Sequence, residues 1–257
     1  MAAADAVVGV LGAFWRRPDA RRLFPLLFPA ICVVGSLLKE LDLVPQSYFS
    51  SSGNVLNVFF VKVSWGWTIF LLAPFVALSN SISRPWAFVL RRLSSLLVAT
   101  GIWYVCTETF FFIEDLTGCC YETGNVQVVL GEFQTKAACK KAGFYWEGFD
   151  ISGHSFILSY SALVIVEEMA GMVDPRSGQP KGLRKDVLSV LYVSLNCIVA
   201  LWVLMFASTS VYFHTPVHKI LGTGTGLFTW LVTYHYWYLM EMSPGLPPKP
   251  KVYKQRA

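Results

Sequence analysis

Six long apolar stretches dominate this sequence, and each approaches the roughly 20 residues that a helix needs to cross a bilayer. They cover residues 23–38, 58–78, 93–113, 154–172, 187–207 and 217–240. Most carry Trp or Tyr near their ends, as transmembrane helices do at the membrane interface. Charged residues make up only 14% of the chain, too few for an ordinary soluble domain. The sequence therefore predicts an all-α integral membrane protein, a single domain over residues 1–257 with six transmembrane helices.

The distribution of Lys and Arg predicts how these helices are oriented. Fifteen of the 21 basic residues lie in the N-terminal arm, the second and fourth connections and the C-terminal tail, which six spans place on one side. Cytosolic segments of membrane proteins are enriched in Lys and Arg. Both termini are therefore predicted to be cytosolic, with residues 1–22 as the arm and residues 243–257 as a flexible tail. Membrane orientation explains the net charge of +5, so nucleic acid is not an expected partner.

The largest connection on the opposite side, residues 114–153, faces the lumen or the cell exterior in this topology. It contains Cys119, Cys120 and Cys139. In an oxidising compartment Cys139 can form a disulfide with either neighbour of the vicinal pair. Free cysteines are an equally good interpretation of the sequence.

Two of the four histidines lie where the fourth and sixth stretches begin, and the predicted topology puts both beginnings on the luminal side. Ser152 is a good N-cap for the fourth helix, with Gly153 and His154 in its first turn. Thr215 and Pro216, directly after His214, are typical of the cap and first position of the sixth helix. Because helix N-termini favour anions, the sequence predicts a phosphate site formed by two helix starts.

A histidine pair at such a site suits phosphoryl transfer. One neutral imidazole attacks phosphorus while the other, protonated, donates a proton to the leaving oxygen. His218, one helical turn beyond His214, is a candidate for orienting the nucleophile. Ser152, Gly153 and Ser155 at the helix start are candidate phosphate contacts, together with Lys219 or Lys62.

Some of these residues, and others in the apolar stretches, allow different interpretations. His154, His214 and His218 form a possible set of three metal ligands, but a fourth ligand other than Asp150 is not evident. Glu108, inside the third stretch, is expensive in lipid and is a candidate for tuning a luminal histidine. Gly222 and Gly226 favour close packing between helices rather than a phosphate loop.

The segment WEGFDISGHSF at residues 146–156, the YFH at residues 212–214, the six stretches and the chain length together resemble the fat storage-inducing transmembrane family. The resemblance covers nearly the whole chain. It implies a lipid phosphatase-like hydrolase of the endoplasmic reticulum membrane, with its active site facing the lumen. The implied reaction cleaves fatty acyl-CoA to acyl 4′-phosphopantetheine and adenosine 3′,5′-bisphosphate without a metal or cofactor, and the family supports lipid droplet formation and lipid balance in this membrane.

The resemblance also implies the roles of the histidines. In related lipid phosphatases the histidine of Pro-Ser-Gly-His is the general acid and a later histidine is the nucleophile, which assigns these roles to His154 and His214. This chain departs from the pattern, because Ile151 replaces the proline, His218 replaces an aspartate, and the Lys and Arg phosphate clamps are missing. Two alternative functions remain open at this stage: a non-catalytic diacylglycerol- or triacylglycerol-binding protein that partitions membrane neutral lipid for droplet budding, and a transporter using Glu108 and the histidines.

Overall fold

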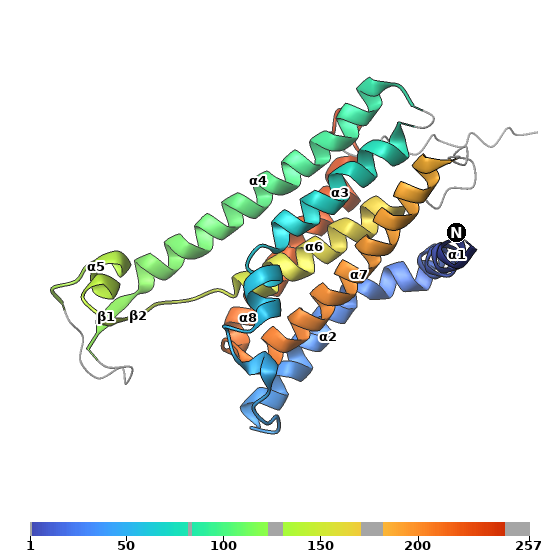
Figure 1. The fold of residues 1–257 in the computed structure, drawn as a ribbon. Coiled ribbons are helices and arrows are strands. Elements are labelled where there is room, and N and C mark those ends of the chain that lie inside the picture. Colours follow the sequence, from blue (N-terminus) through green and yellow to red (C-terminus); the bar gives the residue numbers. More distant parts are fainter. Residues whose placement is uncertain (1, 82–83, 123–130, 171–181, 245–257) are drawn as a thin grey trace, which may run out of the picture.

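The computed structural model describes residues 2–81, 84–122, 131–170 and 182–244. Six helices run lengthwise in one bundle (Figure 1): α2 (Pro18–Glu40), α3 (Ser64–Asn80), α4 (Trp86–Thr117), α6 (Gly153–Met169), α7 (Leu183–Tyr212) and α8 (Pro216–Trp230). Among the residues described, α2, α4 and α7 are long and apolar enough to cross a membrane. The chain is thus a helical integral membrane protein. The tail predicted for residues 243–257 lies almost entirely outside the described residues.

Each long helix coincides with one of the six apolar stretches, and most of the helices extend beyond them. The second stretch is divided: a π-helix, η2 (Asn57–Val61), precedes α3, and a short 3₁₀-helix, η1 (Tyr48–Ser50), lies before it. At the other end of the chain α8 continues into the π-helix η4 (Leu231–Tyr236) and the 3₁₀-helix η5 (Trp237–Leu239). The N-terminal arm is itself a helix, α1 (Ala2–Arg16), which lies across the bundle (Figure 1) and is attached by a 2.7 Å hydrogen bond from Trp15 Nε1 to Asn196 Oδ1.

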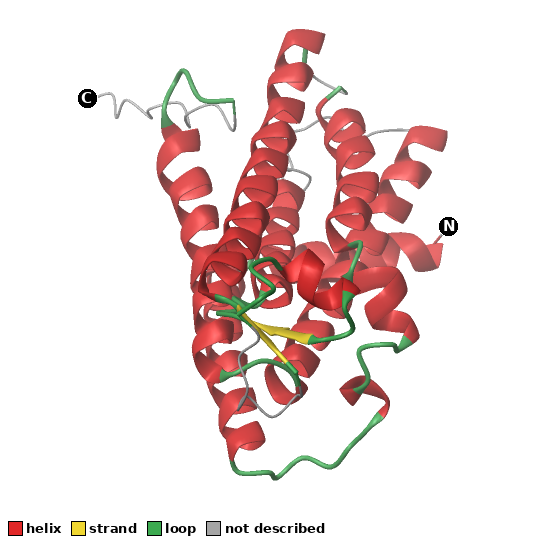
Figure 2. Cartoon of the chain, turned by 90° about the vertical axis from the view of Figure 1, so that its left-hand side faces the viewer, coloured by secondary structure: helices red, strands yellow, loops and turns green. Residues whose placement is uncertain are grey.

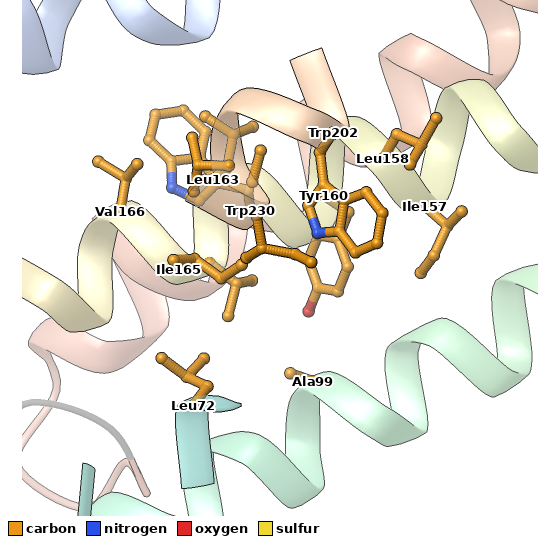
Figure 3. Packing of buried hydrophobic residues seen from close by; sticks show 14 of the residues in the cluster. Leu72, Ala99, Ile157, Leu158, Tyr160, Leu163, Ile165, Val166, Trp202 and Trp230 are labelled. Carbon is orange, nitrogen blue, oxygen red and sulfur yellow. The ribbon is translucent and has the colours of Figure 1, made fainter. Parts of the chain in front are cut away.

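Helix α6 is the centre of the bundle, and nearly all of its side chains are buried. Figure 3 shows Tyr160 and Trp202 among the aliphatic side chains around this helix. Tyr160 also stacks on Trp65 of α3, with ring centroids 5.8 Å apart. Lipid tails are as apolar as these side chains, so helix association in a membrane depends on close packing rather than on removal of apolar surface from water. The close packing along α6 therefore holds its N-terminal residues at a fixed place in the bundle.

Two glycines bring α8 directly against α6, as the sequence predicted. A Cβ atom on Gly222 would lie 2.3 Å from the Ser152 carbonyl oxygen, and one on Gly226 would lie 2.4 Å from Ser159 Oγ. No real side chain tolerates such distances, so only glycine permits this approach. The two helix starts are thereby brought side by side.

The opposite end of α6 carries a buried ion pair. Arg92 of α4 pairs with Glu168, and both side chains are almost completely shielded from solvent. Tyr234 donates a 2.8 Å hydrogen bond to the same carboxylate. The Glu168 side chain is therefore enclosed by residues of α4 and η4.

The connection over residues 114–153 has its own small structure. Two short antiparallel strands, β1 (Cys119–Tyr121) and β2 (Tyr145–Glu147), pair beside the short helix α5 (Lys136–Lys141), and Figure 2 shows these strands at one end of an otherwise helical molecule. Cys120 and Cys139 form a disulfide, whereas Cys119 is exposed. Neighbouring strand residues face opposite sides, which explains why Cys120 rather than Cys119 meets α5.

Candidate active site

The N-terminal ends of α6 and α8 lie together, as the sequence predicted. Ser152 is the N-cap of α6, and its hydroxyl accepts a 3.2 Å hydrogen bond from the Ser155 N–H. Thr215 holds the cap position of α8, followed by Pro216, but makes no side-chain capping bond. The backbone N–H of Ser152 donates to the His218 carbonyl at 3.1 Å, which links the two starts directly. The predicted cap at Ser152 is therefore confirmed with its hydrogen bond, and Thr215 is confirmed in the cap position alone.

A cavity of about 640 Å³ opens beside these helix starts. Its polar end contains Lys62, Asp150, His154 and His214. The remaining wall is mostly apolar and comes from η2, α3, α4 and α6, with Trp65, Trp103, Phe110, Phe111 and Ile157 among its members. The structure thus brings the two predicted catalytic histidines into one cavity.

His214 lies in the turn between α7 and α8 with an unusual backbone. Its φ is +50°, in the left-handed region that residues other than glycine rarely adopt. Such a conformation costs on the order of 1–3 kcal/mol and persists only where surrounding contacts enforce it. Backbone strain of this kind is often found at functional sites, and here it occurs at a residue that lines the cavity.

Asp150 contacts the His214 ring and thereby determines which nitrogen of the neutral imidazole carries the proton. Its Oδ2 atom lies 3.3 Å from His214 Nδ1. With the Nδ1 proton directed to this carboxylate, the lone pair of a neutral imidazole is on Nε2. A carboxylate behind Nδ1 also stabilises the imidazole as it becomes positively charged during attack.

The same contact keeps the carboxyl group ionised. The hydrogen bond from His214 holds the pKa of Asp150 below its ordinary value of 3.8, against the opposing effect of partial burial. The Lys136 ammonium group lowers the pKa further, as do the His214 and His218 rings whenever they are protonated. The Asp150 charge is therefore present at every pH above 3.8 and is lost only as the pH falls through the lowered pKa.

The other residues predicted for the site are placed differently. The His218 ring stands edge-on to the His214 ring, with centroids 6.5 Å apart, and it packs more closely on Phe149, with centroids 4.6 Å apart. Among the described residues, no hydrogen bond joins His218 to His214. The contact expected from His218 is made by Asp150. Ser152 and Ser155 are fully buried and hydrogen-bond to each other at 2.9 Å, while Gly153 lines the cavity.

The two lysines predicted as phosphate contacts differ in burial and in their place relative to the cavity. Lys219 is fully buried and donates a 2.7 Å hydrogen bond to the Ser210 carbonyl, so it lies outside the cavity. Lys62 is exposed at the end of η2 and lines the cavity. Of the two, Lys62 is the one placed to meet an anionic ligand. Glu108 is exposed on α4 and is not part of the cavity wall.

The three histidines considered as metal ligands do not come together as a metal site in the part of the chain that the structure describes. No group of three or more His, Cys, Asp or Glu side chains is close enough there to hold an ion. The cavity instead brings together the His214 imidazole with its Asp150 carboxylate, the His154 imidazole, the Lys62 ammonium group and the N-terminus of α6. These groups suit attack on a phosphoryl centre and protonation of the oxygen that leaves it.

Sequence reasoning did not assign Asp150 its contact with His214. The residue stands four positions before His154 in the segment 146–156, and this proximity was the available signal. Its contact with His214, 64 positions later, depends on how α6 and α8 pack.

Replacement of Asp150 by asparagine is expected to lower kcat by about 10- to 100-fold, because the His214 ring loses its negatively charged partner. Since the pKa of Asp150 is held below 3.8, its charge persists from about pH 5 to 8, and the loss of kcat is expected at every pH in that range. A pH series of initial rates measures this loss. Wild-type activity of Asp150→Asn anywhere in the range would contradict the role of the carboxylate, and Asp115→Asn, an exposed carboxyl in the last turn of α4, is the matched control.

Comparison with known proteins adds to this geometry. Residues 45–192 match the family model described as fat storage-inducing transmembrane protein. The acyl-coenzyme A diphosphatase FITM2 of Danio rerio is 59% identical, over 97% of this chain and 98% of the relative. The human protein of the same name is 47% identical over 91% and 89%, and human fat storage-inducing transmembrane protein 1 is 35% identical over 90% and 78%. No solved structure matches the chain.

Proposed function

The chain belongs to the fat storage-inducing transmembrane protein family, and on that premise we propose that it hydrolyses fatty acyl-CoA at the diphosphate. The products are acyl 4′-phosphopantetheine and adenosine 3′,5′-bisphosphate. One observation carries the proposal: His154 and the Asp150-backed His214 line the same cavity as Lys62. Relatives named acyl-coenzyme A diphosphatase, alike over nearly the whole chain, support the substrate.

The reaction follows from the positions of these groups. Nε2 of neutral His214 attacks one phosphorus of the diphosphate while Asp150 stabilises the imidazole through Nδ1. The bond from that phosphorus to the bridging oxygen breaks, and protonated His154 donates its proton to the departing phosphate oxygen. Water then attacks the phosphohistidine, with neutral His154 accepting its proton, and the second product is released.

Phosphate charge is expected to be stabilised by the start of α6 and by Lys62. The first turn of a helix carries backbone N–H groups without partners in the helix, and its dipole favours an anion. Gly153 lines the cavity and leaves room for an anion to approach this backbone. Lys62 supplies the positive charge that related phosphatases obtain from their Lys and Arg clamps.

The apolar part of the cavity is the proposed site of the acyl chain. Its aromatic wall lies between α3, α4 and α6, at the depth of lipid tails if these helices cross the bilayer. A chain in this position keeps its apolar surface away from water while the diphosphate remains at the polar end.

For the topology we propose six spans formed by α2, α3, α4, α6, α7 and α8 with η4. The charge distribution along the sequence supports cytosolic termini, which would place the cavity at the luminal face of the endoplasmic reticulum membrane. The Cys120–Cys139 disulfide supports an oxidising compartment on that side. Removal of acyl-CoA there would influence membrane neutral lipids, lipid balance and droplet formation, in keeping with the family's name.

Narrowing the apolar wall tests this proposal. Thr107→Trp puts a large ring into the cavity and is expected to lower kcat/KM for a long-chain acyl-CoA by about tenfold, because a few methylenes lose their contacts. A short-chain acyl-CoA is expected to react nearly as well as with the wild-type protein. The control is Tyr104→Trp on the exposed side of the same helix. Equal losses for both chain lengths, or none for either, would contradict the placement of the acyl chain.

A further inference from the structure

The left-handed backbone of His214 needs an external restraint. Among the non-glycine residues that the structure describes, only Asp42 and His214 have positive φ. His214 belongs to neither helix: α7 ends at Tyr212 and α8 begins at Pro216. Its carbonyl group therefore has no place in a helical hydrogen-bond ladder. The contact that this carbonyl makes instead determines how the residue is oriented.

Lys39, in the last turn of α2, supplies that contact. Its Nζ donates a 2.6 Å hydrogen bond to the His214 carbonyl oxygen, and the Lys39 side chain is partly buried. A charged donor makes a stronger bond than a neutral one. Lys39 is not part of the cavity wall, so it reaches the site through the backbone of His214 rather than through bound ligand.

The part of α2 that carries Lys39 is itself fixed against α7. One turn earlier on α2, Gly35 packs so tightly on α7 that a Cβ atom would lie 2.7 Å from Ser210 Cβ. The carbonyl of Ser210 accepts the hydrogen bond of buried Lys219, which comes from α8. Two ammonium groups from different helices thus bind the carbonyls where α7 ends, a position that favours cations. The α7–α8 turn is held from both sides.

We propose that Lys39 is a positioning residue that holds His214 in its left-handed conformation and so aims Nε2 into the cavity. The inference rests on the proposed function of His214 as nucleophile. Without the Lys39 bond, the turn relaxes toward an ordinary φ and rotates the imidazole relative to both Asp150 and the substrate. Substrate binding is expected to be unaffected, because Lys39 is not among the residues that line the cavity.

The test compares Lys39→Met with Lys39→Arg in the purified full-length protein, with palmitoyl-CoA as substrate. Methionine keeps the aliphatic stem but cannot donate, and kcat is expected to fall at least about tenfold with KM within about twofold of wild type. Arginine donates to the same carbonyl and is expected to restore most of kcat. Lys185→Met is the matched control, since Lys185 pairs with Asp5 at the other end of α7.

Each result decides a separate point. Wild-type kcat in Lys39→Met would overturn the positioning role, and a rise in KM at unchanged kcat would show that Lys39 binds substrate instead. If Lys39→Met does not fold, Lys39→Gln replaces it. Its neutral amide donor is one bond shorter than the Lys ammonium group, and its kcat is expected to lie between those of the Met and Arg variants. Loss of kcat in a folded Lys39→Arg equal to that of the Met variant would also contradict the proposal. A wild-type protein without hydrolysis would instead remove the proposed function itself.

Discussion

Alanine at His214 is expected to reduce acyl-CoA hydrolysis by at least about 10³-fold, because the attacking nitrogen is removed and the remaining groups provide only binding and charge. The structure gives this residue two features that a nucleophile requires: a carboxylate beside Nδ1 and a place in the cavity wall. Initial rates with purified protein and palmitoyl-CoA measure the effect. KM is expected to change little, since the ring contributes to the transition state rather than to ground-state binding.

The His154→Ala variant is expected to lose about 10²- to 10⁴-fold, the usual contribution of a positioned general acid. Because the two imidazoles act in one step, the double variant is expected to be no slower than His214→Ala alone. His235→Ala is the matched control: this ring lies 3.6 Å from Glu167, far along α8 and η4 from the cavity, and it is half exposed. Activity lost equally in all three single variants would point to misfolding rather than to catalysis.

The second large effect concerns stability. Glu168→Leu is expected to destabilise the protein by about 3–5 kcal/mol, because it leaves the Arg92 charge in a buried place without its partner. In the part of the chain that the structure describes, two further nitrogens of this guanidinium, Nε and Nη1, are buried without hydrogen-bond partners, so the carboxylate is its one described side-chain partner. Thermal unfolding in detergent micelles, followed by fluorescence, measures the loss.

The double variant Arg92→Met/Glu168→Leu tests the cause. It removes both charges and is expected to recover most of the stability lost in Glu168→Leu. Glu167→Gln is the control, since its partner Arg21 is 41% exposed and such pairs contribute little. A double variant as unstable as the single one would show that packing or the hydrogen bonds of Tyr234 and Ser95, rather than the charge of Arg92, maintain this end of the bundle.

Much of the fold follows from hydropathy. The apolar stretches predicted the six long helices, because a bilayer requires about 20 apolar residues per helical span. Their ends were less predictable, since helices continue past the apolar region: α4 begins at Trp86 and ends at Thr117. The π-helix at Asn57–Val61 and the three-residue strands were not predicted, because such short elements depend on tertiary contacts more than on local pattern.

In the site, too, features set by neighbouring residues were predictable, whereas contacts between residues far apart in the sequence were not. The caps at Ser152 and Thr215 depend on residues that are neighbours in the sequence. That His154 and His214 line one cavity followed from the predicted topology, which puts both helix starts on the same side. The sequence offers Lys62 and Lys219 as alternative phosphate contacts. Lys219 instead faces Ser210 inside the bundle, because the rotation of α8 about its axis sets the direction of this side chain. The contact of Lys39 with His214, 175 positions away, could not be predicted from the sequence because it arises only when α2 packs on α7.

Product analysis in oxygen-18 water is the most direct test of the central claim. We expect the wild-type protein to release equal amounts of acyl 4′-phosphopantetheine and adenosine 3′,5′-bisphosphate, with the heavy oxygen in a phosphate of one of them, and His214→Ala to release neither. Heavy oxygen in free fatty acid would instead mean cleavage of the thioester. Either that result, or undiminished phosphate products from His214→Ala, would contradict the account.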